Sequence, residues 1–360
     1  MRQIVNVVLG IAFLTTGYLL FWPVPIDPSA WSPPESPGFS GPYAKNDRLS
    51  NVEIFPLPAS QGPEDTAVGI DGRIYSGLAD GSIVRFSPEN IDAIETLVNT
   101  GGRPLGLKFH NERLYIADAF IGLIYIDDAT SDGNHKIELA TDKVNGEKML
   151  FVDDLDIAND GTVWFSDAST RFDLHDNILD YMEHRPSGRL ISWNPKTLEM
   201  QVHLEGLAFA NGVALGPDDA YILINETMRY RITRYWLKGE KAGYAEIFAE
   251  NLPGFPDNLS YNHNGLFWVA LVYPRENKID ALLPRPFLRK VILRLPETLR
   301  VSEPEPIAWV VALDYDGEVV HNLQDHTGRY HTVTSVNETG GYLWLGSLTA
   351  TSVARIATPE

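Results

Sequence analysis

The chain contains no cysteine, which excludes disulfide bonds, thiolate nucleophiles and cysteine-ligated zinc. Without thiolates, any bound metal ion must be held by oxygen atoms or imidazoles. Positive charge is also scarce, because 29 Lys and Arg stand against 48 Asp and Glu and give a net charge of −19. Such a charge repels a phosphate backbone, so no nucleic-acid partner is expected. Hydrophobic residues make up 44% of the 360 residues, which is typical of a folded protein.

A long apolar run stands at the amino terminus. It extends from Ile4 to Trp22, 19 residues without a charged side chain, and Asn6 is its one amide side chain. A helix of this length spans a bilayer core of about 30 Å. A cleaved secretory signal is the alternative, but no A-x-A-like site directly follows the run. We expect residues 1–26 to remain as a membrane anchor, with residues 4–22 in the membrane.

The charges that flank this run predict its orientation. Arg2 and the terminal amine precede the run, whereas the first charges after it are Asp27 and Glu35. Positive charge is retained on the cytoplasmic side of a membrane, so we expect a single-pass protein with a cytoplasmic amino terminus. The rest of the chain then lies on the periplasmic, extracytoplasmic or luminal side. Residues 27–50 are rich in Pro, Ser and Gly and are expected to form a linker.

Six related units make up residues 51–360. Each unit has a short apolar strand that starts with polar residues, a polar turn such as Asp-Gly or Gly-Gly, and a second strand of aromatic and β-branched residues. The first strands are expected at 64–68, 105–109, 153–157, 211–215, 257–261 and 334–336. Their starts lie 41 to 77 residues apart, which suits four-stranded blades with outer loops of variable length. The expected fold is all-β, a six-bladed β-propeller around a central channel, with a helical excursion within 279–300.

The first strand of every blade lines the channel of a propeller, so polar residues at the strand starts are expected to meet there. These residues are Glu64, Asp153, Asn211, Asp257 and Asn258. Their carboxylate and amide oxygens are ligands that Ca²⁺ accepts. Three carboxylates that converge without a cation would repel one another. The pattern predicts a calcium ion in the channel, and the alternative is that these residues only cap the strands.

Seven motifs, in order along residues 50 to 357, carry a resemblance to a known family. They are Gly62–Asp65, Gly102–Leu107, Leu114–Asp118, Trp164–Ser169, Gly188–Leu190, Phe209–Val213 and Leu252–Asn258. With these motifs the chain resembles the strictosidine synthase-like family, above all its adipocyte plasma membrane-associated protein branch. That family lies within the wider gluconolactonase and paraoxonase superfamily.

The resemblance implies a six-bladed propeller with calcium in its channel and an activity that hydrolyses lactones or aryl esters. It assigns the calcium ligands to the five polar residues named above, although many relatives have asparagine in place of Asp153. A second, structural calcium of paraoxonase-like relatives would fall on Asp65 and Asp154. Neighbouring residues of a strand face opposite ways, so Glu64 and Asp153 would serve one ion, and Asp65 and Asp154 the other.

Two departures from the family limit what is carried over. Where paraoxonases have a histidine base, this chain has Leu105. Where strictosidine synthase has a glutamate in the sixth inner strand, this chain has Thr334. The histidine dyad is therefore not expected, and a strictosidine synthase-like condensation is disfavoured.

Hydrolysis at a calcium ion still needs a base or nucleophile. Asp257, at the ion, is one candidate, and Asp118, at the end of the second strand of the second unit, is another. Asp118 has the alternative role of a solvated residue at a strand end. Five aromatic residues in loops are expected to rim the channel and to favour acyl or aryl groups: Phe120, Phe172, Tyr181, Phe255 and Tyr273. The rival function is a non-catalytic, membrane-tethered, calcium-binding propeller.

Overall fold

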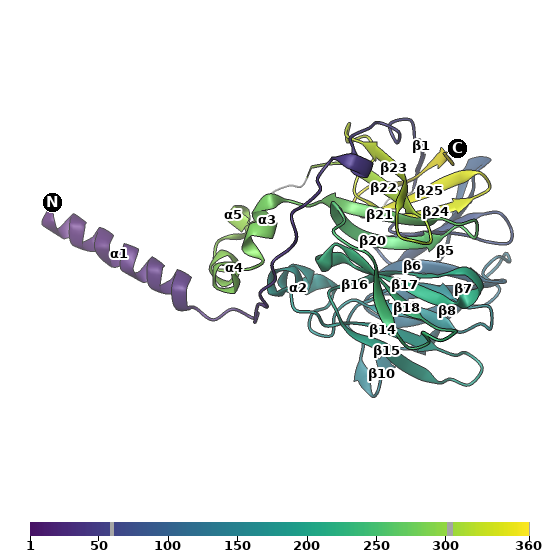
Figure 1. The fold of residues 1–360 in the computed structure, drawn as a ribbon, viewed down its shortest axis with the longest axis horizontal. Helices are drawn as coiled ribbons and strands as arrows, with labels where there is room; N and C mark the ends of the chain where they lie inside the picture. The colour runs from purple at the N-terminus through teal and green to yellow at the C-terminus, as the bar shows by residue number, and fades with distance from the viewer. Residues whose placement is uncertain (58–60, 301–304, 360) are drawn as a thin grey trace.

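Six four-stranded antiparallel sheets make up the main body of the protein (Figure 1). The computed structural model describes residues 1–57, 61–300 and 305–359. Within these residues the sheets are arranged as the blades of a propeller, as the repeat in the sequence predicts. A two-stranded hairpin, β10 (Lys143–Val144) with β11 (Glu147–Lys148), stands outside the blades.

Each blade contains four strands that follow one another in sequence. The first strands are β2 (Thr66–Val68), β6 (Pro104–His110), β12 (Val152–Ile157), β16 (Ala210–Leu215), β20 (Gly254–Tyr261) and β24 (Val333–Thr339). The second strands are β3 (Ile74–Gly77), β7 (Arg113–Asp118), β13 (Val163–Asp167), β17 (Tyr221–Glu226), β21 (Phe267–Pro274) and β25 (Tyr342–Ser347). The third strands are β4 (Ser82–Ser87), β8 (Gly122–Ile126), β14 (Gly188–Trp193), β18 (Arg231–Trp236), β22 (Ala308–Leu313) and β26 (Ser352–Ala357). The outermost strands are β5 (Asn90–Asn99), β9 (Ile137–Thr141), β15 (Met200–Leu207), β19 (Ala245–Ala249), β23 (Val319–Asp325) and β1 (Glu53–Pro56).

The ring is closed by the two ends of the domain. Strand β1 pairs with β26, with Glu53 opposite Arg355, so the amino-terminal strand completes the last blade. Each first strand contacts the first strand of the next blade, and β24 contacts β2. Apolar side chains fill the space between blades; Leu223 of the fourth blade, for example, packs in one cluster with Phe267 and Trp309 of the fifth. The free edges are the outermost strands of the blades, at the circumference of the ring.

Short helices gather at one end of the propeller. Helix α2 (Asn177–Glu183), preceded by η2 (Leu174–Asp176), connects β13 to β14, and α3 (Asn277–Leu282), α4 (Pro286–Leu293) and α5 (Glu297–Arg300) follow β21. The helices α3 to α5 confirm the predicted excursion. Because neighbouring strands are antiparallel, these connections lie at the end of the channel where the first strands begin. We call this end the entrance. The remaining short turns are η1 (Gly41–Tyr43), η3 (Pro217–Asp219) and η4 (Thr227–Arg229).

Helix α1 (Arg2–Phe21) projects away from the propeller on the side of α3 to α5 (Figure 1). It has 20 residues, a mean hydropathy of 2.1 and no buried residue, so it is long and apolar enough to cross a membrane. A signal sequence at this position has the same features.

The segment 27–50 is extended, but it is docked on the propeller rather than loose. The Trp31 ring stacks on His184 with ring centroids 5.1 Å apart, and Phe39 stacks on Trp309 at 4.7 Å. The Ser29 amide also donates to the carbonyl of Glu183. The expectation of a flexible tether, drawn from Pro, Ser and Gly content, overlooked these aromatic side chains, which gain from burial against the blades.

Candidate metal centre

The polar residues at the strand starts are placed by irregularities in the first strands. Five of these strands shift register where they begin, as in a β-bulge. The residues left between paired positions are 105–106, 153–154, 211–212, 257–258 and 334–335. At Gly212 the adjacent strand comes so close that an added Cβ would lie 2.5 Å from the Asp257 carbonyl oxygen. The bulges therefore release side chains from the ladder and let neighbouring strands approach.

The structure brings four of the five predicted ligands into two hydrogen-bonded pairs. Nδ2 of Asn211 donates to Oδ1 of Asp257 at 2.6 Å. Nδ2 of Asn258 donates to both carboxylate oxygens of Glu64, at 3.0 and 3.1 Å. Each amide thus uses its donor on a carboxylate. The carbonyl oxygens of both amides, Oδ1 of Asn211 and Oδ1 of Asn258, are buried and accept no hydrogen bond from any described residue.

Three buried carboxyl groups share this site. Glu64 and Asp153 are each 3% exposed and Asp257 is 8% exposed. Burial raises the pKa of Glu64 well above its usual range, and repulsion from Asp257 and then Asp153 adds to it. Burial, followed by repulsion from Asp257, likewise raises the pKa of Asp153. Burial raises the pKa of Asp257 to about 7, opposed by the hydrogen bond from Asn211. The site therefore places negative charge where neither water nor a close ion pair offsets it.

Arg103, which the sequence did not predict, is the positively charged side chain that acts on the carboxyl groups of this site. It attracts Glu64 and Asp153 and so opposes the rise of their pKa values. Its Nη1 donates to the Gly62 carbonyl at 2.8 Å, and it makes no ion pair within 4.0 Å among the described residues. A second missed residue, Asn225, donates from Nδ2 to the backbone carbonyl of Asp257 and so fixes the bulge. Its position near the end of a second strand, beside the ligands of the first strands, is the sequence feature that could have predicted it.

The donor chemistry fits a hard cation. Within residues 1–57, 61–300 and 305–359, no group of three or more Asp, Glu or His side chains has by itself the spacing of a metal site. The five predicted ligands are a different kind of group, because two of them, Asn211 and Asn258, are amides that stand beside the carboxylates. Two buried amide oxygens without donors, beside three carboxylates, are the oxygen ligands that Ca²⁺ takes in irregular geometry. An unpartnered buried acceptor costs about 1–3 kcal/mol, which a bound cation would offset.

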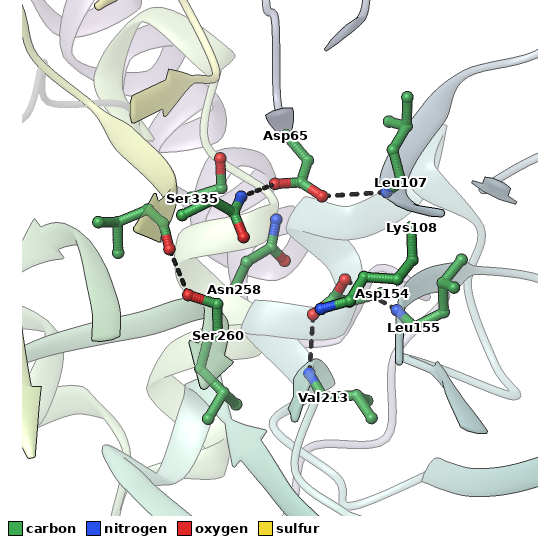
Figure 2. A pocket seen from close by; sticks show the side chains of 12 residues that line it. Asp65, Leu107, Lys108, Asp154, Leu155, Val213, Asn258, Ser260 and Ser335 are labelled. Carbon is green, nitrogen blue, oxygen red and sulfur yellow. Dashed lines mark hydrogen bonds between the residues drawn. The ribbon is translucent and has the colours of Figure 1, made fainter. Parts of the chain in front are cut away.

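Asp65 and Asp154, the residues expected to hold a second ion, line a pocket with Lys108 and Asn258 (Figure 2). Each follows an entrance carboxylate by one residue, so it lies one position further along the channel, in what we call the deeper layer. Both oxygens of each carboxylate accept hydrogen bonds. Asp65 accepts from the Leu107 amide at 3.0 Å and from Asn337 at 2.9 Å. Asp154 accepts from the amides of Leu155 and Val213, each at 2.8 Å. The bonds from Leu107, Asn337 and Val213 join neighbouring blades, which gives both carboxylates a structural role without a metal ion.

A lysine already supplies positive charge to this deeper layer. Lys108 lines the same part of the channel, and its Nζ lies 3.0 Å from Oδ1 of Asp156. Burial opposes its charge, but attraction from Asp156, Asp154 and Asp65 raises its pKa on balance. The second calcium ion therefore stays a prediction, and the ammonium group of Lys108 is the alternative source of positive charge for these carboxylates.

Asp118, the other catalytic candidate, holds a loop in place. Its Oδ1 accepts from the amides of Arg103, Phe120 and Ile121 at 3.0 to 3.1 Å, and its Oδ2 accepts from the Thr100 hydroxyl at 2.8 Å. It is fully buried, so the alternative of a solvated strand-end residue is wrong. Two other second strands end alike: Asp167 accepts from the Phe151 amide, and Glu226 accepts from the Ala208 amide. This carboxylate is a repeated feature of the blades.

Aromatic side chains cover the entrance. Tyr181 of α2 packs against Phe209 and Phe255, with ring centroids 5.2 and 6.2 Å apart. Burial raises the pKa of Tyr181, with further contributions from Asp257 and Asp153, which places its hydroxyl near these carboxylates. Burial raises the pKa of Tyr273, a hydrogen bond with Thr332 opposes the rise, and repulsion from Asp257 adds to it.

The two other expected rim residues have partners of their own. Phe120 stacks on His175 with centroids 4.5 Å apart, and Phe172 lies under the Arg171 guanidinium at 5.6 Å. Neither of these contacts involves a predicted ligand.

The two departures from the family also have clear environments. Leu105 is buried in an apolar cluster with Phe151 and Phe209. The Thr334 hydroxyl donates to the Glu64 carbonyl at 2.5 Å. Neither side chain offers a base at the site.

Comparisons with known proteins agree with this architecture. Family profiles described as strictosidine synthase and as strictosidine synthase-like, N-terminal, match residues 153–240 and 41–86. Strictosidine synthase-like 4 of Arabidopsis thaliana is 35% identical, over 88% of this chain and 84% of the relative. The adipocyte plasma membrane-associated protein of Danio rerio is 36% identical, over 90% and 82%.

Solved structures with the same fold are more distant in sequence. A gluconolactonase of Xanthomonas campestris superposes with a TM-score of 0.61 at 14% identity, covering 87% of this chain and 91% of that one. The calcium-binding protein regucalcin of Agrobacterium tumefaciens gives 0.56 at 13% identity, covering 84% and 90%. Identity this low shows the fold alone. On the curated relatives, the chain belongs to the family of strictosidine synthase-like and adipocyte plasma membrane-associated proteins.

Proposed function

We propose that this protein is a calcium-dependent hydrolase of lactones or of aryl and carboxylic esters. Glu64, Asp153, Asn211, Asp257 and Asn258 would hold the ion. One observation carries the proposal: two buried amide oxygens without donors stand among three buried carboxylates at the entrance. The gluconolactonase and regucalcin folds support the assignment, because both are propellers of the same kind.

The residues divide the work of hydrolysis. A bound calcium ion would polarise the carbonyl of the substrate and stabilise the oxyanion that forms. Asp257 is the proposed base, because Oδ1 is occupied by Asn211 while Oδ2 accepts no hydrogen bond from a described residue. A carboxylate beside the cation is ionised near neutral pH and can take a proton from water. The attacking oxygen forms the new C–O bond, the ester C–O bond breaks, and the proton on Asp257 passes to the leaving alkoxide.

Tyr181 and Tyr273 are proposed to orient the substrate. Asp257 acts on the pKa of both hydroxyl groups, and both side chains present a ring as well as a hydroxyl group. Phe209 and Phe255 extend this apolar cover beside Tyr181. The surroundings favour an apolar acyl or aryl group beside the carbonyl.

The membrane arrangement is part of the proposal. We infer that α1 is retained as a single membrane span, with its amino terminus in the cytoplasm and the propeller on the other side. The hydropathy of α1 and the adipocyte plasma membrane-associated relatives support a membrane location. Protease accessibility of the propeller in sealed spheroplasts or microsomes, with amino-terminal sequencing of the mature protein, tests both the orientation and the retention of the anchor.

The test of function uses phenyl acetate and γ- and δ-lactones with the purified full-length chain. Hydrolysis should disappear with chelator, return with Ca²⁺, and fall by about 10²-fold or more in Glu64→Gln. Glu147→Gln, on the exposed hairpin, is the matched control and should keep full activity. A non-catalytic calcium-binding propeller would bind the ion but show no turnover at any calcium level.

A further inference from the structure

The segment from Arg275 to Arg300, which contains α3, α4 and α5, has a composition unlike the rest of the chain. It carries seven Lys and Arg against three Asp and Glu, whereas the whole chain has a net charge of −19. We call this segment the entrance cap. Large apolar side chains are exposed on it: Phe287 is 55% exposed, Leu288 41% and Leu299 70%. Basic and apolar groups displayed together are typical of a surface that meets a membrane interface.

Helix α4 is two-sided. Arg289 is 1% exposed and donates to the carbonyls of Met182 and Glu183, so one side of the helix is fixed to α2. Phe287 precedes Arg289 by two residues, which at 100° per residue places it on the opposite side of the helix. The side that carries Phe287 packs on nothing among the described residues that would bury it. An apolar side of this kind needs a partner from outside the domain.

The entrance cap is joined to the anchor helix. Nε of Arg294 donates to the Trp22 carbonyl at 2.6 Å, and its Nη1 donates to the Leu19 carbonyl at 2.8 Å. These are carbonyl groups at the carboxyl end of α1, where the helix leaves its own hydrogen-bonding ladder. Trp22, at the end of an apolar helix, is the residue type that marks the membrane–water interface. The end of α4 therefore lies at the level where α1 would leave the membrane (Figure 1).

We propose that the entrance cap docks on the phospholipid bilayer that α1 spans, with Phe287 and Leu288 in the apolar boundary and the exposed Lys278, Arg285 and Arg300 among anionic headgroups. The channel entrance then faces the membrane, which selects amphiphilic lactones or esters that partition there. This proposal rests on the proposed anchor. Lipid is favoured over a protein partner because the cap is continuous with α1 and because its net charge is positive although the whole chain is acidic.

The absence of native cysteine makes the test direct. Single cysteines are introduced as Phe287→Cys, Leu14→Cys and Ile70→Cys in the full-length chain and labelled with an environment-sensitive fluorophore. Ile70 is a matched control, because it is 67% exposed and lies in the β2–β3 turn at the far end of the propeller. The protein is placed in vesicles of phosphatidylcholine and phosphatidylglycerol that contain lipids with nitroxide at the upper acyl chain.

The expected result is strong nitroxide quenching at Phe287 and Leu14 and none at Ile70. Quenching at Leu14 without quenching at Phe287 would overturn the docking of the cap and leave the anchor standing. No quenching at Leu14 would overturn the anchor itself, and the docking proposal with it. Protection of Phe287 from aqueous iodide without lipid quenching would mean that protein covers the surface, and would also overturn the proposal.

A charge series checks the headgroup contribution. Lys278→Glu and Arg285→Glu each alter an exposed cap residue, and Lys196→Glu, at the far end of the propeller, is the control. A basic residue near an anionic surface is worth roughly fivefold in binding, and each cap variant also adds a negative charge, so each should lower the equilibrium constant for docking by about fivefold or more. Equal quenching in all three variants, or in vesicles of phosphatidylcholine alone, would overturn the electrostatic part of the proposal.

Discussion

The two polar layers of the channel are made by neighbouring residues, yet they differ in chemistry. At the entrance, the oxygens of Asn211 and Asn258 have no donor and three carboxylates lie close by. One residue further along the same strands, Asp65 and Asp154 have every carboxylate oxygen in a hydrogen bond. Successive side chains of a strand point to opposite sides, so Glu64 and Asp153 face away from Asp65 and Asp154. Asn258, which follows Asp257, connects the two sets, because it donates to Glu64 and also lines the pocket of Asp65 and Asp154 (Figure 2).

The deeper layer continues around the ring and holds the blades together. Ser260 of the fifth blade donates to the Val336 carbonyl of the sixth at 2.6 Å. Asn337 of the sixth blade donates to the Thr66 carbonyl of the first at 2.7 Å. Asp156 accepts from the Leu215 amide at 2.8 Å. The first strands thus lack a continuous ladder between blades but are linked by side chains. The comparison indicates that one layer stabilises the fold while the other is kept incomplete for a ligand.

The sharpest way to break this comparison is to exchange one carboxylate in each layer. Asp257→Asn should lower hydrolysis by about 10²–10⁴-fold, because the proposed base is lost while the shape is kept. Asp65→Asn should leave kcat within a small factor of the parent and act on stability instead. Initial rates with phenyl acetate at saturating Ca²⁺, with melting temperatures, measure both. Equal loss of activity in the two variants would show that the layers do not divide function from structure.

The next largest effect is expected from truncating the deeper layer. Asp154→Ala leaves the amides of Leu155 and Val213 without acceptors, each at a cost of about 1–3 kcal/mol. Removal of the repulsion between Asp154 and Asp65 offsets part of this cost. We expect a net loss of about 2–3 kcal/mol in the free energy of unfolding, measured by urea denaturation, with calcium affinity unchanged. A loss of calcium affinity as large as that in Glu64→Gln would instead assign Asp154 to a metal site.

A pH series sharpens the electrostatic side of the comparison. The pKa of Asp257 rises from 3.8 to about 7 on burial, so the folded, metal-free protein binds more protons than the unfolded chain between these values. Stability contributed by the protonated carboxyl is therefore present below pH 3.8 and is lost as pH rises towards 7. Metal-free protein should melt at a lower temperature at pH 7 than at pH 5, by more than Asp257→Asn does. Ca²⁺ should remove the difference, and a flat profile without metal would contradict the raised pKa of this buried carboxyl.

The sequence predicts the blades well because each blade repeats a local pattern. Strand, turn and strand are encoded within about 20 residues, and the position of Glu64, Asp153, Asn211 and Asp257 at strand starts is sufficient to place them around one axis. Asp65 accepts from Leu107 and Asp154 accepts from Val213, which belong to neighbouring blades, and such partners depend on packing between blades that a local pattern does not encode. The docking of residues 27–50 was also missed, because its contacts lie about 150 to 280 residues away in sequence.

The smallest effect is expected at Asp118, where the two catalytic candidates can be separated. Three of its four hydrogen bonds end on Oδ1, which an asparagine carbonyl retains, and only the Thr100 hydroxyl bond to Oδ2 is lost. Asp118→Asn should therefore cost about 0.5–1.5 kcal/mol of stability and leave kcat unchanged. If Asp118 removes the proton from water, the same substitution lowers kcat by about 10²-fold or more, because an amide is not a base. A pH–rate profile that keeps its shape in Asp118→Asn but loses its acidic limb in Asp257→Asn assigns the base to the entrance layer.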